Sequence, residues 1–228
     1  MGKPQKYFAI QQAGRTAEVY IYGDIVPYPW DNSDMSGQTL ADQIKEMDVD
    51  IIHVYINSYG GSVSEAWAMY NALRRHPAKV VTYGEGFVAS AALYPFLAGD
   101  ERYASSMSAY YLHEVMVYAD GYAKDMRAAA EEADMLTTIG VGAFVEQAGM
   151  REETVRELME KETWLAPGEA LELGIATGIL RAETEAVTQS ARRDVMGKIL
   201  QREKDPGNPA GPVRQKGKNS VLGLFENI

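Results

Sequence analysis

Apolar and polar positions along residues 1–180 alternate between a strand-like period of two and a helical period of 3.6. Strand-like runs rich in β-branched and aromatic residues cover residues 17–25, 51–56, 79–83 and parts of 102–115. Helical spacing covers residues 39–47, 62–76, 121–149, 154–161 and 167–173. Strands that alternate with helices are typical of βαβ units around a mostly parallel sheet, so we expect an α/β fold.

Local signals set several of these boundaries. Ser62 and Glu65 have the S-x-x-E spacing of a capping box, which predicts a helix start at Ser62, and Pro77 then ends that helix. Gly174 is a typical stop for the helix before it. Pro95 is harder to place, because a helix that began near Ser90 would meet it after one turn and kink. The conflict disappears if that helix begins later.

The pattern changes from about Glu183 onward. A Pro/Gly-rich stretch at residues 205–212 cannot continue a helix, and residues 181–228 carry nine Lys/Arg against six Asp/Glu in a chain of net charge −10. We therefore expect one folded domain over residues 1–182 and a polar, basic, flexible tail over residues 183–228.

Composition narrows the class of protein. A net charge of −10 argues against nucleic acid as a main partner, since phosphate binding needs a basic surface. The absence of cysteine excludes disulfides and thiolate chemistry and fits a reducing compartment. No apolar run approaches the roughly 18 residues of a membrane span, and the N-terminus lacks the apolar core of a signal peptide. We expect a cytoplasmic protein with no membrane partner.

Candidate chemistry centres on a serine. Ser90 follows a strand-like stretch in a run of small and apolar residues, His113 lies in a second apolar stretch, and Gly60-Gly61 could offer backbone N–H groups. A nucleophile, a base and an electrophilic pocket are the components of an acyl-transfer hydrolase. The other histidines fit less well, since His53 lies within a strand and His76 ends a helix.

Each component also has a plainer interpretation. Ser90 alone could be a small residue at a tight contact, and Gly60-Gly61 could be a turn that needs positive φ. The glycine pair follows a buried strand and precedes a capped helix, where N–H groups favour anions, and this position supports a functional loop.

Four segments together resemble a known family: residues 56–63, 86–90, 112–113 and 164–174 are similar, in order and spacing, to the ClpP family of serine peptidases. The resemblance covers about residues 17–180. The sequence at Glu162-Thr163-Trp164 and the tail look most like ClpP-like proteins of bacteriophages and prophages, which are associated with maturation of the virus head. The resemblance implies a ClpP/crotonase-like spiral of βαβ units with a protruding long helix, residues 121–149, that builds stacked rings.

The family's catalytic roles carry over to individual positions. Ser90 matches the nucleophile and His113 the general base, and the resemblance implies oxyanion donors at the N–H groups of Gly61 and Ala91. Glu162 aligns with the third member, which is normally Asp.

The acid position departs from the family pattern. Glu162 is one methylene longer than Asp, Glu160 is the fallback, and Glu114 is adjacent to the base. The family's ring-linking arginine is Lys161 here, which cannot form the same bidentate fork.

The resemblance implies a serine endopeptidase that needs no metal or organic cofactor and cleaves proteins or peptides inside a homo-oligomeric ring. We expect a role in phage head maturation, with capsid or scaffold proteins as partners. The alternatives are a general Clp-type proteolytic subunit with an ATPase partner, a crotonase-like acyl-CoA enzyme, or an inactive structural ring protein.

Overall fold

The computed structural model describes residues 10–28 and 35–180, and the predicted tail at 183–228 lies outside them. Within the described residues, eight strands form one sheet. The strands are β1 (Ile10–Ala13), β2 (Thr16–Ile21), β3 (Ile51–Ser58), β4 (Lys79–Ala89), β5 (Glu101–Ser105), β6 (Ala109–Leu112), β7 (Thr163–Leu165) and β8 (Gly178–Leu180). The helices are α1 (Gly37–Lys45), α2 (Val63–Arg75), α3 (Leu93–Leu97), α4 (Ala123–Ala148), α5 (Glu152–Glu160) and α6 (Pro167–Glu172). A 3₁₀ turn, η1 (Ser90–Ala92), joins β4 to α3.

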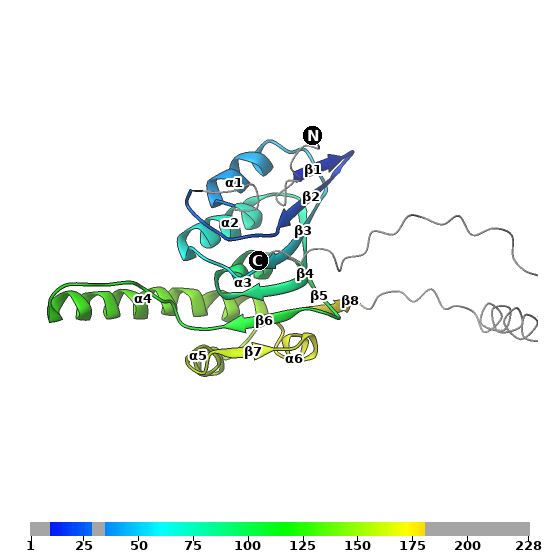
Figure 1. Cartoon of the computed structure of the whole chain (residues 1–228). Helices are drawn as coiled ribbons and strands as arrows, with labels where there is room; N and C mark the ends of the chain where they lie inside the picture. The colour runs from blue at the N-terminus through cyan, green and yellow to red at the C-terminus, as the bar shows by residue number, and fades with distance from the viewer. Residues whose placement is uncertain (1–9, 29–34, 181–228) are drawn as a thin grey trace, which may run out of the picture. The chain divides into compact units, whose positions relative to one another are not determined.

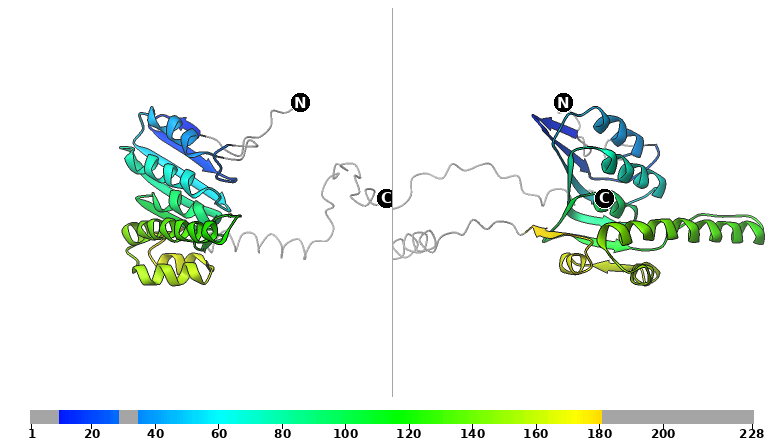
Figure 2. Two further views of the ribbon diagram at one scale, coloured as in Figure 1. Left: turned by 90° about the vertical axis from the view of Figure 1, so that its left-hand side faces the viewer. Right: turned by 180° about the vertical axis from the view of Figure 1, so that it is seen from behind.

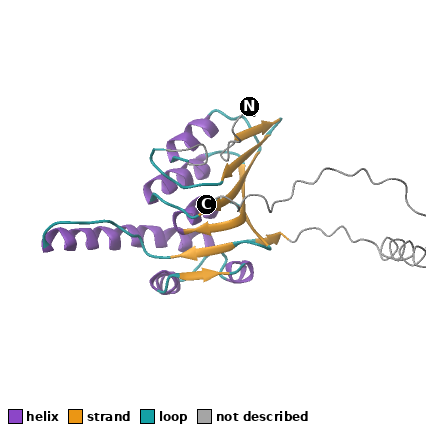
Figure 3. Cartoon of the chain, in the orientation of Figure 1, coloured by secondary structure: helices purple, strands orange, loops and turns teal. Residues whose placement is uncertain are grey.

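The sheet is mixed but mostly parallel. Strands β2, β3, β4, β5 and β8 are parallel neighbours, and β1 adds an antiparallel edge. Strand β4 changes partner along its length, because Val81–Gly84 pairs with β5 and Phe87–Ala89 pairs with β6. Helices α1, α2 and α3 cover one face of the sheet, and α4 extends away from it (Figures 1 and 3). The predicted α/β fold is confirmed.

Four tyrosines fix the register of the central strands. Tyr20, Tyr55, Tyr83 and Tyr103 are direct neighbours on β2, β3, β4 and β5. Their rings stack with centroids 4.8, 4.8 and 5.7 Å apart. Residues on the alternate face, such as Val54, are fully buried. A slip of one residue would exchange these two faces, so the pairing is strongly specified.

The structure agrees with the predicted helix boundaries, but one of the hydrogen bonds expected in the capping box of α2 is made to a different partner. Ser62 caps α2 by accepting a hydrogen bond from the Glu65 N–H at 3.5 Å. The Glu65 carboxylate accepts instead from the Gly37 N–H at 2.7 Å, so it links α2 to the start of α1. Pro95 lies in the first turn of α3, which begins at Leu93, so its missing N–H leaves no helical bond unmade.

The long helix α4 is anchored only at its C-terminal half. Its buried residues are Thr137, Gly140, Val141 and Phe144, while the N-terminal half is exposed and projects beyond the sheet (Figure 2). The pattern predicts a long helix here, and the family resemblance implies that it protrudes. Within the described part of the chain, no helix is both long enough and apolar enough to cross a membrane.

A buried arginine ties the end of α4 to the sheet. The Arg102 guanidinium on β5 donates hydrogen bonds to the carbonyls of Gly99, Gln147, Gly174 and Ile175, at 2.8 to 3.0 Å. Burial lowers the pKa of Arg102 from its ordinary value. The carbonyl groups accept from four of its five N–H donors and hold α4 and the loop after α6 against β5.

Candidate active site

Three strand ends create the site. Strands β3, β4 and β6 are parallel neighbours, with Ser58 opposite Val88 and Ala89 opposite Tyr111. Parallel strands present their carboxyl ends at the same edge of a sheet, where ligand sites of α/β proteins form. The residues that follow these ends are Gly60-Gly61, Ser90 and His113, so the topology brings together the groups that the sequence singles out.

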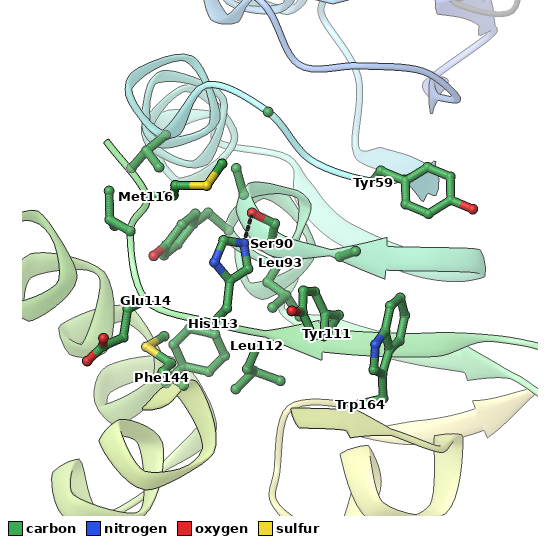
Figure 4. Close-up of a pocket in the computed structure, with 17 residues that line it drawn as sticks. Tyr59, Ser90, Leu93, Tyr111, Leu112, His113, Glu114, Met116, Phe144 and Trp164 are labelled. Atoms are coloured by element: carbon green, nitrogen blue, oxygen red, sulfur yellow. Dashed lines mark hydrogen bonds between the residues drawn. The ribbon is translucent and has the colours of Figure 1, made fainter. Parts of the chain in front are cut away.

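Ser90 and His113 are paired. The His113 Nε2 and the Ser90 Oγ are 2.7 Å apart, a hydrogen-bond distance for a nucleophile and its base (Figure 4). Ser90 has φ 55°, a left-handed conformation that is rare for a residue with a side chain. The strained turn lies where β4 gives way to η1 and carries the hydroxyl into the space beside β6. Strain held at such a point is typical of functional residues.

The glycine pair lies against the serine. A Cβ on Gly60 would be 2.6 Å from the Ala89 carbonyl oxygen and 2.9 Å from the Ser90 Cβ, so only glycine fits. The Gly60 carbonyl and the Ser62 N–H both bond to Ile25, at 2.8 and 2.7 Å. The Gly61 N–H between them takes part in no hydrogen bond among the described residues.

The second candidate oxyanion donor lies on the other side of the serine. Ala91 is in the first turn of η1, where N–H groups have no partner within the helix. Gly61 and Ala91 both line the cavity that holds Ser90, so each N–H can serve a developing oxyanion there.

The pair opens into a cavity of about 330 Å³. Met116 and Phe144 lie on one side of His113, and Tyr111 and Trp164 lie on the other (Figure 4). Further apolar lining comes from Val63, Leu93, Tyr94, Val115 and Met159. Burial raises the pKa of Tyr94 to about 12, so its hydroxyl stays neutral. The cavity thus offers apolar surface around one nucleophile–base pair.

The carboxylate candidates lie apart from the base. Glu162 follows α5 with φ 50°, and its Oε2 is 3.4 Å from the Tyr111 hydroxyl. Within the described residues it makes no hydrogen bond to His113. The exposed Glu114 lines the cavity, but its carboxylate is turned away from the His113 ring (Figure 4). Glu160 is exposed at the end of α5. The role of Glu162 as the third member remains a prediction.

Lys161, which the resemblance aligns with the family's ring-linking arginine, is engaged locally. Its Nζ is 2.5 Å from the Glu157 carboxylate, one helical turn earlier in α5. Both side chains are more than 60% exposed, so the pair contributes little to stability.

Sequence reasoning missed two supports of the site. The Asn57 side chain accepts a hydrogen bond from the Phe87 N–H at 3.0 Å and so holds the end of β4 next to β3. Tyr94 packs edge-on against Phe144 of α4 and Trp67 of α2, at 6.3 and 5.9 Å between centroids. An amide shortly before the Gly60-Gly61 loop was a usable signal for Asn57, whereas Tyr94 was visible only as part of a general excess of tyrosine.

Comparison with known proteins gives a direct answer on family. The sequence profile of Clp protease matches residues 24–183. The chain belongs to the Clp protease family. It is 29% identical over 132 residues to ATP-dependent Clp protease proteolytic subunit 2 of Treponema denticola, which covers 57% of this chain and 66% of that protein. It is 30% identical over 136 residues to subunit 2 of Mycolicibacterium paratuberculosis, with 58% and 68% covered.

A solved structure agrees with this Clp protease assignment at the level of fold. A point mutant of ClpP1 from Listeria monocytogenes superposes with a TM-score of 0.62 over 74% of this chain and 92% of that one, at 22% identity. The matched regions span about two thirds of the length of the two curated relatives. The chain therefore belongs to this family by sequence and has its fold.

Proposed function

We propose that this chain is a serine endopeptidase, a Clp-type proteolytic subunit that hydrolyses peptide bonds within a homo-oligomeric ring. The observation that carries the proposal is the 2.7 Å contact between Ser90 and His113 at the floor of an apolar cavity. Two neighbouring backbone N–H groups, on Gly61 and Ala91, supply the electrophilic part of the same site.

The reaction uses only groups of the chain itself. The His113 Nε2 takes the proton of Ser90 as its Oγ attacks the peptide carbonyl, and the Gly61 and Ala91 N–H groups stabilise the oxyanion. His113 then gives the proton to the leaving amine, which leaves an acyl-Ser90 ester. Water, deprotonated by His113, hydrolyses the ester and restores Ser90. Glu162 is the candidate for holding the imidazole during these steps.

The alternatives of another chemical class fit the site less well. A crotonase-like acyl-CoA enzyme needs paired N–H groups and a carboxylate acid–base, and it has no use for a serine hydrogen-bonded to a histidine. A purely structural ring protein has no need to keep Ser90 in a strained backbone conformation beside a base.

The relatives favour one partner class. They are named as ATP-dependent Clp protease proteolytic subunits. We therefore propose a general Clp-type subunit that receives substrate from an ATPase partner as the main function. The expected role in phage head maturation, with capsid or scaffold proteins as substrates, rests on the sequence near Glu162 and on the tail, and it stays a prediction.

A serine-directed fluorophosphonate tests the proposed chemistry. We expect the probe to label the wild-type chain at Ser90, with Ser90→Ala and His113→Ala unlabelled. Hydrolysis of unstructured peptides should fall by roughly 10⁶ in Ser90→Ala, as for loss of a triad nucleophile. Met107→Ala, a change at an exposed residue between β5 and β6, is the control. Hydrolysis by Ser90→Ala within tenfold of wild type would refute the serine mechanism.

A further inference from the structure

Four aromatic side chains form a continuous surface next to the catalytic pair. Tyr59 follows β3, Phe87 lies on β4, Tyr111 on β6 and Trp164 on β7. Phe87 contacts Tyr59 and Trp164 with centroids 4.8 and 5.5 Å apart, and Trp164 stacks on Tyr111 at 4.5 Å. We call these four residues the aromatic wall. Its labelled members lie on the opposite side of His113 from Met116 (Figure 4).

The side chains of the aromatic wall are exposed to solvent, although the hydrophobic effect favours their burial. Tyr59 is 66% exposed, Trp164 48% and Phe87 37%. Single exposed apolar residues are common on protein surfaces, but a contiguous cluster marks a binding surface. Tyr59, Tyr111 and Trp164 also line the same cavity as Ser90, so the wall is continuous with the site of reaction.

The backbone holds the aromatic wall in a fixed geometry. Tyr111 and Trp164 are directly opposite residues of the antiparallel pair β6–β7, which fixes their stack. The Phe87 N–H is held by the Asn57 side chain at 3.0 Å, and a Cβ on Gly86 would be 2.3 Å from the same Asn57 oxygen. A surface ordered before binding loses little conformational entropy when a ligand docks, and this favours a recognition role.

The position of the wall selects its ligand. A polypeptide held with its scissile carbonyl at Ser90 must run past both sides of His113, and successive side chains of an extended peptide point in opposite directions. One side chain then enters the part of the cavity beside Met116 and Phe144, and a side chain across the scissile bond meets the wall on the other side of His113. Aromatic faces and edges favour aromatic or large aliphatic groups.

We infer that the aromatic wall is a second specificity subsite, which binds an aromatic or large aliphatic residue of the substrate on the opposite side of the scissile bond from the residue beside Met116 and Phe144. This inference rests on the proposed endopeptidase function and adds a substrate class to it. Contact with the wall buries only part of such a side chain, and selection of about tenfold or more over alanine is expected.

Internally quenched peptides test the subsite in the full chain. The peptides carry Phe, Leu or Ala at each position flanking the cleavage site, and kcat/KM is measured for each. Wild type should prefer Phe and Leu over Ala by about tenfold or more at the position that meets the wall. Trp164→Ala and Phe87→Ala should bring the Phe-to-Ala ratio at that position close to one. Met107→Ala removes an exposed apolar side chain elsewhere and should leave the ratio at its wild-type value.

A binding measurement separates this inference from the proposed reaction. In the Ser90→Ala background, fluorescein-labelled Phe and Ala peptides are compared by fluorescence anisotropy, with and without Trp164→Ala. Tighter binding of the Phe peptide that is lost with Trp164→Ala supports the subsite even if wild type proves unable to hydrolyse peptides. A Phe-to-Ala ratio that Trp164→Ala and Phe87→Ala leave unchanged, in cleavage or in binding, overturns the subsite while fluorophosphonate labelling of Ser90 still upholds the serine chemistry.

Discussion

The Tyr111 hydroxyl lies 3.4 Å from the carboxylate of Glu162, the candidate third member of the triad. This distance is long for a hydroxyl–carboxylate hydrogen bond, so the contact is weak. Burial and the charge of Glu162 raise the pKa of Tyr111, which keeps its hydroxyl protonated as a donor. Within the described residues the Glu162 carboxylate therefore meets the Tyr111 hydroxyl and makes no hydrogen bond to His113.

Glu162→Gln should slow peptide hydrolysis by at least about 100-fold if Glu162 orients His113 during turnover, because the amide cannot stabilise the imidazolium. Tyr111→Phe removes the hydroxyl that Glu162 meets in this structure and keeps the ring, so it should raise turnover if the freed carboxylate serves His113. Steady-state kcat of the purified variants tests whether Glu162 orients His113.

The matched carboxylate variants assign the role if Glu162 does not hold it. If Glu162→Gln leaves the rate of peptide hydrolysis unchanged and Glu160→Gln or Glu114→Gln lowers it, the residue whose substitution lowers the rate is the third member of the triad. Three neutral substitutions would mean that Ser90 and His113 work as a dyad.

The strained backbone at Ser90 predicts a difference between two inactive variants. Ser90 has φ 55°, which costs a residue with a Cβ about 1 kcal/mol and costs glycine almost nothing. Ser90→Gly should therefore be more stable than Ser90→Ala by about 1 kcal/mol in urea unfolding, although both lack the hydroxyl. If the two variants have the same urea midpoint and the same dependence of unfolding free energy on urea concentration, the turn carries no strain.

A glycine on the long helix sets the packing beside the cavity that holds Ser90. A Cβ on Gly140 would lie 2.1 Å from the Tyr94 hydroxyl, whereas a Cβ on Gly142 meets nothing within 4 Å. Gly140→Ala should destabilise by about 1–3 kcal/mol through overpacking and lower activity by displacing Tyr94, which lines the cavity. Gly142→Ala should stabilise by about 0.5–1 kcal/mol through helix propensity.

The same contact allows a rescue. Tyr94→Phe removes the clashing hydroxyl, and the nearest remaining ring atom is 3.1 Å from the place that the added carbon would occupy. The double variant Gly140→Ala/Tyr94→Phe should recover most of the lost stability in a thermal melt. If the stability losses of the two single variants simply add in the double variant, Tyr94 is not the group that Gly140 accommodates.

Local sequence signals predicted the parts of the site that follow strands directly. Ser90 and His113 each come one residue after a strand that is visible as an apolar run, and Gly60-Gly61 lies between such a run and a capping box. Parallel strands end at a common edge, so these signals alone bring all three groups together. The family resemblance supplied the catalytic role expected for each of these residues.

The features that the sequence did not predict depend on contacts between distant segments. Strands β1, β7 and β8 have only three or four residues, too few for a period to be visible. The partner of Glu162 and the stack of Trp164 on Tyr111 both follow from the β6–β7 register, which joins segments about 50 residues apart. The aromatic wall could not be read from the sequence for the same reason.

The helix α4 exposes large apolar side chains that its own fold does not bury, with Met135 55%, Ile139 53%, Val145 40% and Met126 38% exposed. Exposed apolar side chains around the helix suit contact with further copies of the chain. Met135→Glu/Ile139→Glu should therefore lower the particle mass measured by light scattering, whereas Met107→Glu, a change at an exposed apolar position outside α4, should not.

Truncation after Arg181 removes the predicted tail and should leave the number of subunits per particle unchanged. A truncated chain that falls to monomers while the full chain stays oligomeric would place the interface in the tail, and intact particles in the Met135→Glu/Ile139→Glu variant would remove α4 from it.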